Sequence, residues 1–208
     1  MKYFASPRHS SARLRGNRGF SLITTLILLV VVTFLGIGAS QMVLLSERST
    51  RFDRDQQIAF QAAEAALIDA EFDIRGPNIS VSQRVAMFTG TPDDKVNFVL
   101  GCGTGILLGL CSDAFINNKP VWYGVEFTDT SAGAKTIKFG EFTGRTLSTG
   151  TTGVRPEMLP RYIIEAIDDK TPGSSSTSTP KILYRVTAMG FGPRKETQAV
   201  VQMIFRKE

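Results

Sequence analysis

The stretch Arg18-Gly-Phe-Ser-Leu-Ile23 opens the segment that decides the fold of this 208-residue chain. From Gly19 to Ser46 the sequence contains no charged side chain. Because an α-helix rises about 1.5 Å per residue, this segment is long enough to cross a bilayer core of roughly 30 Å. Residues 1–18 carry five basic side chains and no acidic one. That asymmetry predicts a cytoplasmic N-terminus and a C-terminal part beyond the membrane.

Helical spacing continues past the apolar segment, from Gln41 to Phe72. Apolar residues recur at intervals of three, four or seven, which predicts one buried helix face made of Phe52, Ala59, Ala62, Ala63, Ala66, Ala70 and Ile74. Alanines on this face would let a sheet pack closely against it. Gly76-Pro77 predicts the helix end. From Phe20 to Ile74 we therefore expect one helix of about 80 Å.

The composition excludes several classes of function. The chain has 24 Lys and Arg against 19 Asp and Glu; removing the five basic residues of 1–18 leaves 19 against 19. A chain that starts at Phe20 is thus neutral, with no concentrated basic face, and direct nucleic-acid binding is not expected. The single histidine, His9, lies in the N-terminal segment. Without it no catalytic set is found, so we expect neither an enzyme nor a cofactor.

Two acidic pairs and two cysteines remain to be interpreted. Asp93-Asp94 and Asp168-Asp169 lie in turn-like contexts that favour solvated turns, with a calcium site as the minor alternative. Cys102 and Cys111 are the only cysteines, and both fall on the predicted non-cytoplasmic side, where disulfides persist. A disulfide is therefore favoured over two free thiols, and closing so short a loop stabilises by roughly 3 kcal/mol in the chain-entropy model.

The glycines around Cys102 superficially suggest a phosphate-binding loop. The full fingerprint is missing, because no Gly-Lys-Ser/Thr follows and no strand–turn–helix unit surrounds the loop. We expect instead that these glycines let the short ring turn.

The C-terminal part has the pattern of a sheet. Strands are predicted at 119–127, 135–142, 161–167, 182–189 and 197–205, the last two as a hairpin, with a polar loop at 171–180. The expected fold class is α+β, with the long N-terminal helix packed on a C-terminal antiparallel sheet.

The junction Gly19-Phe20 resembles the class III leader of type IV pilins and type II secretion pseudopilins. In those families a prepilin peptidase in the membrane cuts between glycine and phenylalanine and methylates the new N-terminus. The resemblance thus implies cleavage after Gly19 and an N-methylated Phe20. A rival cleavage site is Gly36-Ile37-Gly38, whose small-x-small pattern suits a secretory signal and would leave a mature chain starting near Ala39.

Thr24 departs from the pattern of these families. Most members carry a glutamate at this fifth mature position, where it meets the terminal ammonium of the neighbouring subunit already in the filament. Thr24 lacks the usual glutamate and offers no charge. A subunit at the extreme tip has no neighbour beyond it, so Thr24 predicts a place near the tip; the alternative is that threonine is merely tolerated.

The run from Ile58 to Leu67, followed by Asp69-Ala-Glu71, resembles the N-terminal signature of the PilX family of minor pilins. The segments 160–165 and 184–188 are also similar to that family. The resemblance implies a minor pilin that primes assembly of the type IV pilus and supports adhesion, twitching motility and DNA uptake. The implied partners are other minor pilins, the major pilin, a pilus-tip adhesin, the prepilin peptidase and the inner membrane.

This interpretation divides the chain into a leader (1–19), a transmembrane and filament-core helix (20–45), its amphipathic continuation (46–75) and a periplasmic or extracellular pilin domain (76–208). The chain would be an inner-membrane protein before assembly and part of the surface pilus afterwards. Two alternatives remain. A pseudopilin at the tip of the type II secretion pseudopilus also lacks the glutamate, but usually carries a large helical insertion for which this chain has no room. A membrane-anchored periplasmic enzyme or binding protein would need a ligand-binding cluster.

Overall fold

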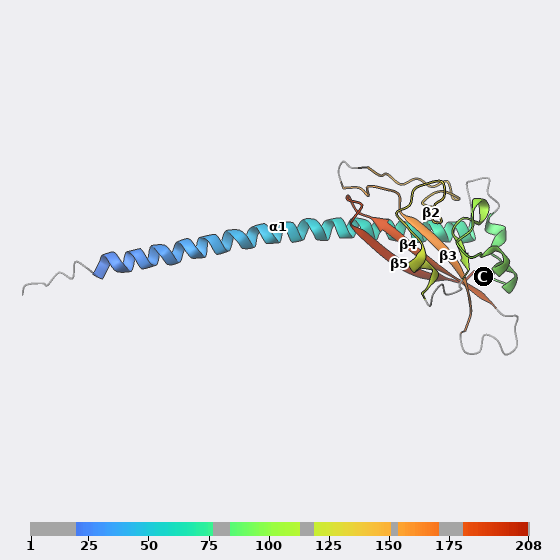
Figure 1. Ribbon diagram of the computed structural model, residues 1–208, viewed down its shortest axis with the longest axis horizontal. Coiled ribbons are helices and arrows are strands. Elements are labelled where there is room, and N and C mark those ends of the chain that lie inside the picture. Colours follow the sequence, from blue (N-terminus) through green and yellow to red (C-terminus); the bar gives the residue numbers. More distant parts are fainter. Residues whose placement is uncertain (1–19, 77–83, 113–118, 151–153, 171–180, 208) are drawn as a thin grey trace, which may run out of the picture. The chain divides into compact units, whose positions relative to one another are not determined.

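The computed structural model describes residues 20–76, 84–112, 119–150, 154–170 and 181–207 (Figure 1). The chain divides into two compact units, residues 1–50 and 51–208. Helix α1 (Phe20–Arg75) begins in the first and ends in the second, which confirms the predicted helix with its end one residue later. The leader and the serine-rich loop 171–180 lie outside the described residues.

In the first unit, α1 presents its apolar side chains outward. Large exposed ones include Leu22, Leu28, Phe34, Leu35 and Val43. By length and composition, α1 contains a segment that could cross a membrane. The hydroxyls of Thr24, Thr25 and Thr33 donate to carbonyls three residues earlier in the same helix, so threonine fits an apolar segment. The helix is continuous through Gly36 and Gly38.

The second unit contains a five-stranded sheet made of β1 (Leu110–Ser112), β2 (Ile137–Lys138), β3 (Arg161–Asp168), β4 (Ile182–Phe191) and β5 (Gln198–Phe205). The order is β1-β3-β4-β5, and β2 also pairs with β3. The predicted strands at 161–167, 182–189 and 197–205 are confirmed, as is the C-terminal hairpin.

The sheet is mixed, not wholly antiparallel, because β1 runs parallel to β3. Parallel neighbours need a long crossover connection, and the chain between Ser112 and Arg161 is long enough to return to the starting end. The α+β arrangement itself is as expected.

Two predicted strands are wrong or shortened. Most of 119–127 is not a strand: the 3₁₀-helix η4 (Val121–Gly124) follows Pro120 there, and Val121 and Phe127 pack beside the cysteines and Ile163. Their apolar character reflects burial over the sheet and not pairing within it. In 135–142 only β2 pairs, because the chain turns at Gly140, whose φ is +81°. Three further 3₁₀-helices are η1 (Arg84–Met87), η2 (Pro92–Asn97) and η3 (Gly105–Leu107).

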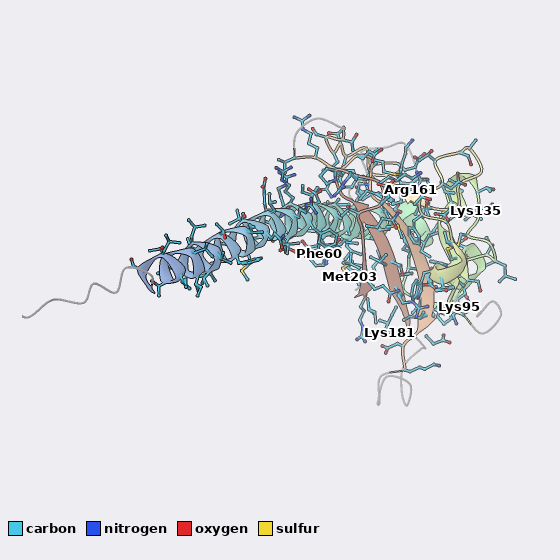
Figure 2. The ribbon with its side chains drawn as sticks, turned by 60° about the vertical axis from the view of Figure 1, so that its left-hand side comes forward. Phe60, Lys95, Lys135, Arg161, Lys181 and Met203 are labelled. Carbon is cyan, nitrogen blue, oxygen red and sulfur yellow. A yellow bond between two sulfur atoms is a disulfide. The ribbon has the colours of Figure 1, made fainter. Side chains whose placement is uncertain are left out.

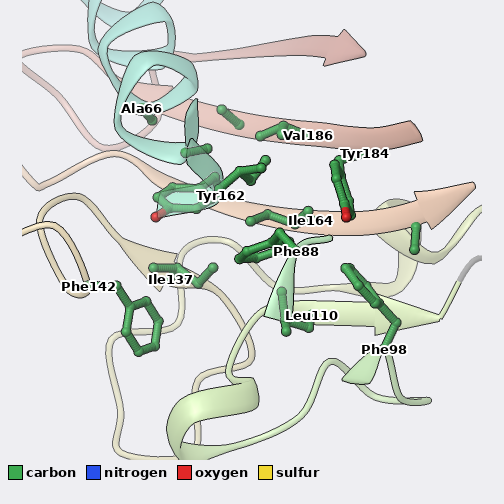
Figure 3. Packing of buried hydrophobic residues seen from close by; sticks show 14 of the residues in the cluster. Ala66, Phe88, Phe98, Leu110, Ile137, Phe142, Tyr162, Ile164, Tyr184 and Val186 are labelled. Atoms are coloured by element: carbon green, nitrogen blue, oxygen red, sulfur yellow. The ribbon is translucent and has the colours of Figure 1, made fainter. Parts of the chain in front are cut away.

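The core lies between α1 and the sheet (Figure 3). The predicted helix face is buried from Ala59 to Ile74, where Ala66, Ala70 and Ile74 join a cluster with Tyr162 and Val186. Phe52 is the exception: its side chain is 56% exposed, so it does not belong to the buried face. Because alanine side chains are small, the helix backbone lies close to the strands.

Two contacts end α1. Gly76 has φ of +79° and its N–H donates to Phe72 O at 2.8 Å, a left-handed C-terminal cap that glycine adopts without strain. Near the C-terminus of the chain, Lys207 Nζ donates to Ile74 O at 2.8 Å and to Val85 O at 3.1 Å. A cation on the last carbonyls of a helix also matches the helix dipole.

Candidate functional site

The most unusual feature of the second unit is a pair of acids on the buried face of α1. Asp69 and Asp73 lie one turn apart and both are 0% exposed. Charged side chains this deeply buried require partners. The apolar periodicity of α1 did not reveal them, because it places apolar residues and says nothing of polar side chains on the same face. Their spacing of four residues was the available signal.

Asp69 fixes the turn that follows β2. Gly140 N donates to Asp69 Oδ2 at 2.8 Å, and the Thr143 hydroxyl donates to Oδ1. Burial raises the pKa of Asp69, while these two hydrogen bonds and the Arg145 charge, 4.0 Å away, lower it. The helix thus holds the segment around 137–145 through one carboxylate.

Asp73 is paired with Arg84, which is also fully buried. Arg84 Nε lies 3.2 Å from Asp73 Oδ2 as an ion pair, at an angle outside hydrogen-bond geometry, and Tyr162 donates to the same oxygen at 3.3 Å. Burial raises the pKa of Asp73 to about 6, although Arg84 opposes this shift. Burial lowers the pKa of Arg84, which the Asp73 charge opposes.

Arg84 connects three parts of the unit. Its Nη1 donates to Ile106 O at 3.1 Å and Leu108 O at 2.9 Å, and its guanidinium carbon lies 3.9 Å from the centre of the Phe142 ring. One guanidinium therefore ties α1 to the loop between the cysteines and to the segment after β2. Cation–π contact adds to the ion pair where water is excluded.

The predicted disulfide is present between Cys102 and Cys111, and both residues are buried. The expected role of the glycines is also confirmed. Gly103 has φ of +54°, and a side chain at Gly109 (φ +72°) would place its Cβ only 2.4 Å from Ile137 Cγ1. The two cysteines pack with Val121, Phe127 and Ile163, whereas Leu107 and Leu108 of the same loop pack against the core cluster that includes residues of α1.

We expect Cys102→Ser to lower the free energy of unfolding by about 3 kcal/mol, because the closed loop restricts the unfolded chain. The measurement is thermal melting of the purified protein. Wild-type protein melted with a reductant is the control and should approach the variant. Thiol labelling of the denatured, unreduced wild type should find neither cysteine free; labelled Cys102 would contradict the disulfide.

The acidic pairs fit the expected solvated positions only in part, because Asp93 and Asp168 are exposed whereas the carboxylates of Asp94 and Asp169 are buried. Asp94 is buried, not solvated: its carboxylate accepts from the N–H groups of Thr89 and Gly90, both at 2.8 Å, and from the Tyr184 hydroxyl. Asp168 pairs with Lys95, and Asp169 with Arg206, each at 2.7 Å. Within the described ranges, no group of three or more His, Cys, Asp or Glu could hold a metal ion.

The two units hold different predicted residues. Thr24 belongs to the first, where its hydroxyl donates to Ser21 O at 2.9 Å. Cys102 and Cys111 belong to the second. Gly19 lies outside the described residues, and Phe20 is the first residue of α1.

Comparison with known proteins yields two family matches. Residues 18–67 match the PilX N-terminal family, and residues 91–207 match the type IV pilus assembly protein PilX C-terminal family. Neither a curated protein nor a solved structure matches the chain. The C-terminal match alone spans more than half of the 208 residues, and the N-terminal match covers the apolar half of α1 and its alanine-rich continuation. The chain therefore belongs to the PilX family of type IV pilus assembly proteins.

Proposed function

We propose that this minor pilin of the PilX family is made as an inner-membrane precursor, is cut after Gly19, and enters the type IV pilus at or near its tip, where it helps prime assembly. The matches to both PilX families carry the proposal. Through the pilus it would support adhesion and twitching motility. Its partners would be other minor pilins, the major pilin and a tip adhesin.

The first half of α1 suits two environments in succession. Its apolar side chains are exposed in the isolated chain. Burial of apolar surface is favourable in proportion to its area, whether lipid or other helices supply the cover. Residues 20–45 would therefore cross the membrane before assembly and pack among the helices of the filament afterwards, and residues 46–75 and 76–208 would remain outside the membrane.

Deletion of the gene in its own host tests this function. We expect few surface pili and lost twitching, both restored by the wild-type gene, since a priming subunit acts before the shaft grows. Electron microscopy of pili and a stab-agar motility assay measure this. Normal piliation with a defect in protein secretion would instead support the pseudopilin alternative.

Processing is tested at the junction of leader and helix. Mass spectrometry of the protein from purified pili should find an N-methylated Phe20 at the N-terminus. Gly19→Val should leave the precursor uncut, because the peptidase of this family requires the small residue before the cut. Gly16→Val, within the leader, is the matched control and should be processed normally. A mature chain starting near Ala39 would reject the pilin cleavage.

Thr24→Glu tests the position in the filament. At the tip no ammonium lies beyond the subunit, so the new carboxylate would be buried without a partner. An unpaired buried charge costs several kcal/mol, and protonation of the carboxylate relieves part of that cost. We expect the variant to be inserted and cleaved normally but incorporated several-fold less, measured against the major pilin in sheared filaments. Thr24→Val is the uncharged control and should be incorporated normally. Enrichment of the glutamate variant would place the subunit along the shaft.

A further inference from the structure

A pocket of about 320 Å³ lies in the second unit, between the loop at 104–108 and the segment 130–141. Its lining is mainly polar and includes Thr130, Ser131, Thr136, Lys138, Glu141 and Arg161. Pockets for small molecules in proteins span about 300–1,000 Å³, so this one has room for a ligand the size of a monosaccharide.

Arg161, the first residue of β3, supplies a buried cation to this pocket (labelled in Figure 2). Arg161 is only 7% exposed. Nε donates to the Thr136 hydroxyl and Nη2 to the Thr136 carbonyl at 2.8 Å. A guanidinium has about five N–H donors in a planar fork, so two contacts to one residue leave part of the fork unused.

Within the part of the chain that the structure describes, Arg161 has no acidic ion-pair partner of the kind that buried arginines usually have. Among the described residues no carboxylate forms an ion pair with it, in contrast to Arg84 and Arg185, which pair with Asp73 and Glu165. Burial lowers the pKa of Arg161, and the charges of Asp129 and Glu141 only partly oppose this. A cation removed from water without a partner is destabilised, and an anion bound in the pocket would relieve that cost.

The remaining residues that line the pocket indicate which chemical groups the anion would have. Thr130 and Ser131 line the pocket, and although the Ser131 hydroxyl accepts from Gly133 N–H at 3.2 Å and bonds the Asp129 carboxylate, a hydroxyl has a second acceptor position for a ligand hydroxyl. Lys138 and Glu141 also line the pocket and pair with each other at 3.0 Å, so the net positive charge of the lining is that of Arg161. A guanidinium fork matches a carboxylate through two parallel hydrogen bonds. The site thus combines a carboxylate position with positions for hydroxyl groups.

We propose that this pocket binds a small carboxylate rich in hydroxyl groups, of the chemical class of uronic acids. The carboxylate meets the Arg161 fork, and the sugar hydroxyls meet Thr130 and Ser131. In a minor pilin exposed on the pilus, this pocket would bind acidic glycans. The proposal does not depend on a tip position, since any exposed subunit would carry the pocket.

Titration of the intact chain in detergent micelles with D-glucuronate, followed by ligand-observed NMR, tests this. D-glucuronamide has the same ring without the negative charge and should bind about tenfold more weakly or not at all. Arg161→Gln should weaken glucuronate binding about tenfold or more. Lys181→Gln is the matched control: Lys181 is exposed and precedes Ile182, which pairs with Asp168 at the far end of β3, so binding should not change.

A second variant keeps the test decisive if Arg161→Gln does not fold. Ala132 lines the pocket and is exposed, so Ala132→Phe should block the pocket without disturbing the core, and should abolish binding. Ala132→Ser is its control and should bind normally. Undetectable glucuronate binding, or binding that survives Ala132→Phe, would overturn the proposal. So would tighter binding of N-acetyl-aspartate amide than of glucuronate, which would assign the pocket to an acidic side chain of a protein partner.

Discussion

Replacing Gly190 by alanine is expected to destabilise residues 51–208 by about 3 kcal/mol or more, a large part of the roughly 5–15 kcal/mol that holds a typical domain together. Gly190 lies in β4 where α1 crosses the sheet. A Cβ there would lie 2.1 Å from Ala59 O and 2.3 Å from Ala63 N. Both are backbone atoms of the helix, so relief requires the whole helix to move away from the strands and open the core.

Gly124→Ala is the matched control, because a Cβ at Gly124 meets nothing within 4 Å. Neither glycine has a positive φ, so a difference between the two variants reports steric overlap and not backbone strain. Urea unfolding followed by the fluorescence of the single tryptophan, Trp122, measures the second unit alone. Equal midpoints for Gly190→Ala and wild type would show that the helix does not pack this closely.

Arg84→Met should cost about 3–5 kcal/mol at neutral pH, the usual effect of removing one partner from a buried ion pair. The substitution leaves Asp73 buried without its cation, and it also leaves the carbonyls of Ile106 and Leu108 without the Arg84 donor. Arg75→Met is the control: Arg75 is exposed and its pair with Glu71 is worth little. The measurement is again urea unfolding.

The pH dependence of this loss identifies its cause. The pKa of Asp73 is raised from 3.8 to about 6 in the folded protein, so folding favours the protonated acid. The stability that this group contributes is therefore present below about pH 4 and is lost as the pH rises through about 6. Without Arg84 the opposing charge is gone and the pKa of Asp73 rises further. Arg84→Met should thus be tolerated better near pH 5 than near pH 8.

A double variant separates the buried charge from the lost packing. Asp73→Leu together with Arg84→Met removes both charges, so it should recover part of the stability lost by Arg84→Met alone and lose most of the pH dependence between about pH 5 and pH 8. If Arg84→Met loses the same stability near pH 5 and near pH 8, Asp73 is not the group responsible for the loss.

The sequence predicted those features that neighbouring residues determine. The helix from Phe20, its alanine face and its end before Gly76 follow from a periodicity of 3.6 and from the chemistry of helix termini. The C-terminal hairpin follows from two alternating segments separated by a turn. The disulfide follows from the only two cysteines of the chain, nine residues apart on the predicted non-cytoplasmic side. In each case the residues that interact lie close in sequence or have a single available partner.

Tertiary structure alone decided what depends on residues far apart in the chain. The segment 119–127 has the composition of a strand, yet it forms η4 because its apolar side chains are needed over Ile163 and the cysteines. The parallel pairing of β1 depends on where the chain returns to the sheet. In the sequence, nothing distinguishes Asp69 and Asp73 from exposed helix acids, or Arg161 from an exposed residue at the start of a strand. Their burial is set by loops that close over them, and the energy of a charge depends on those distant surroundings and not on its neighbours in sequence.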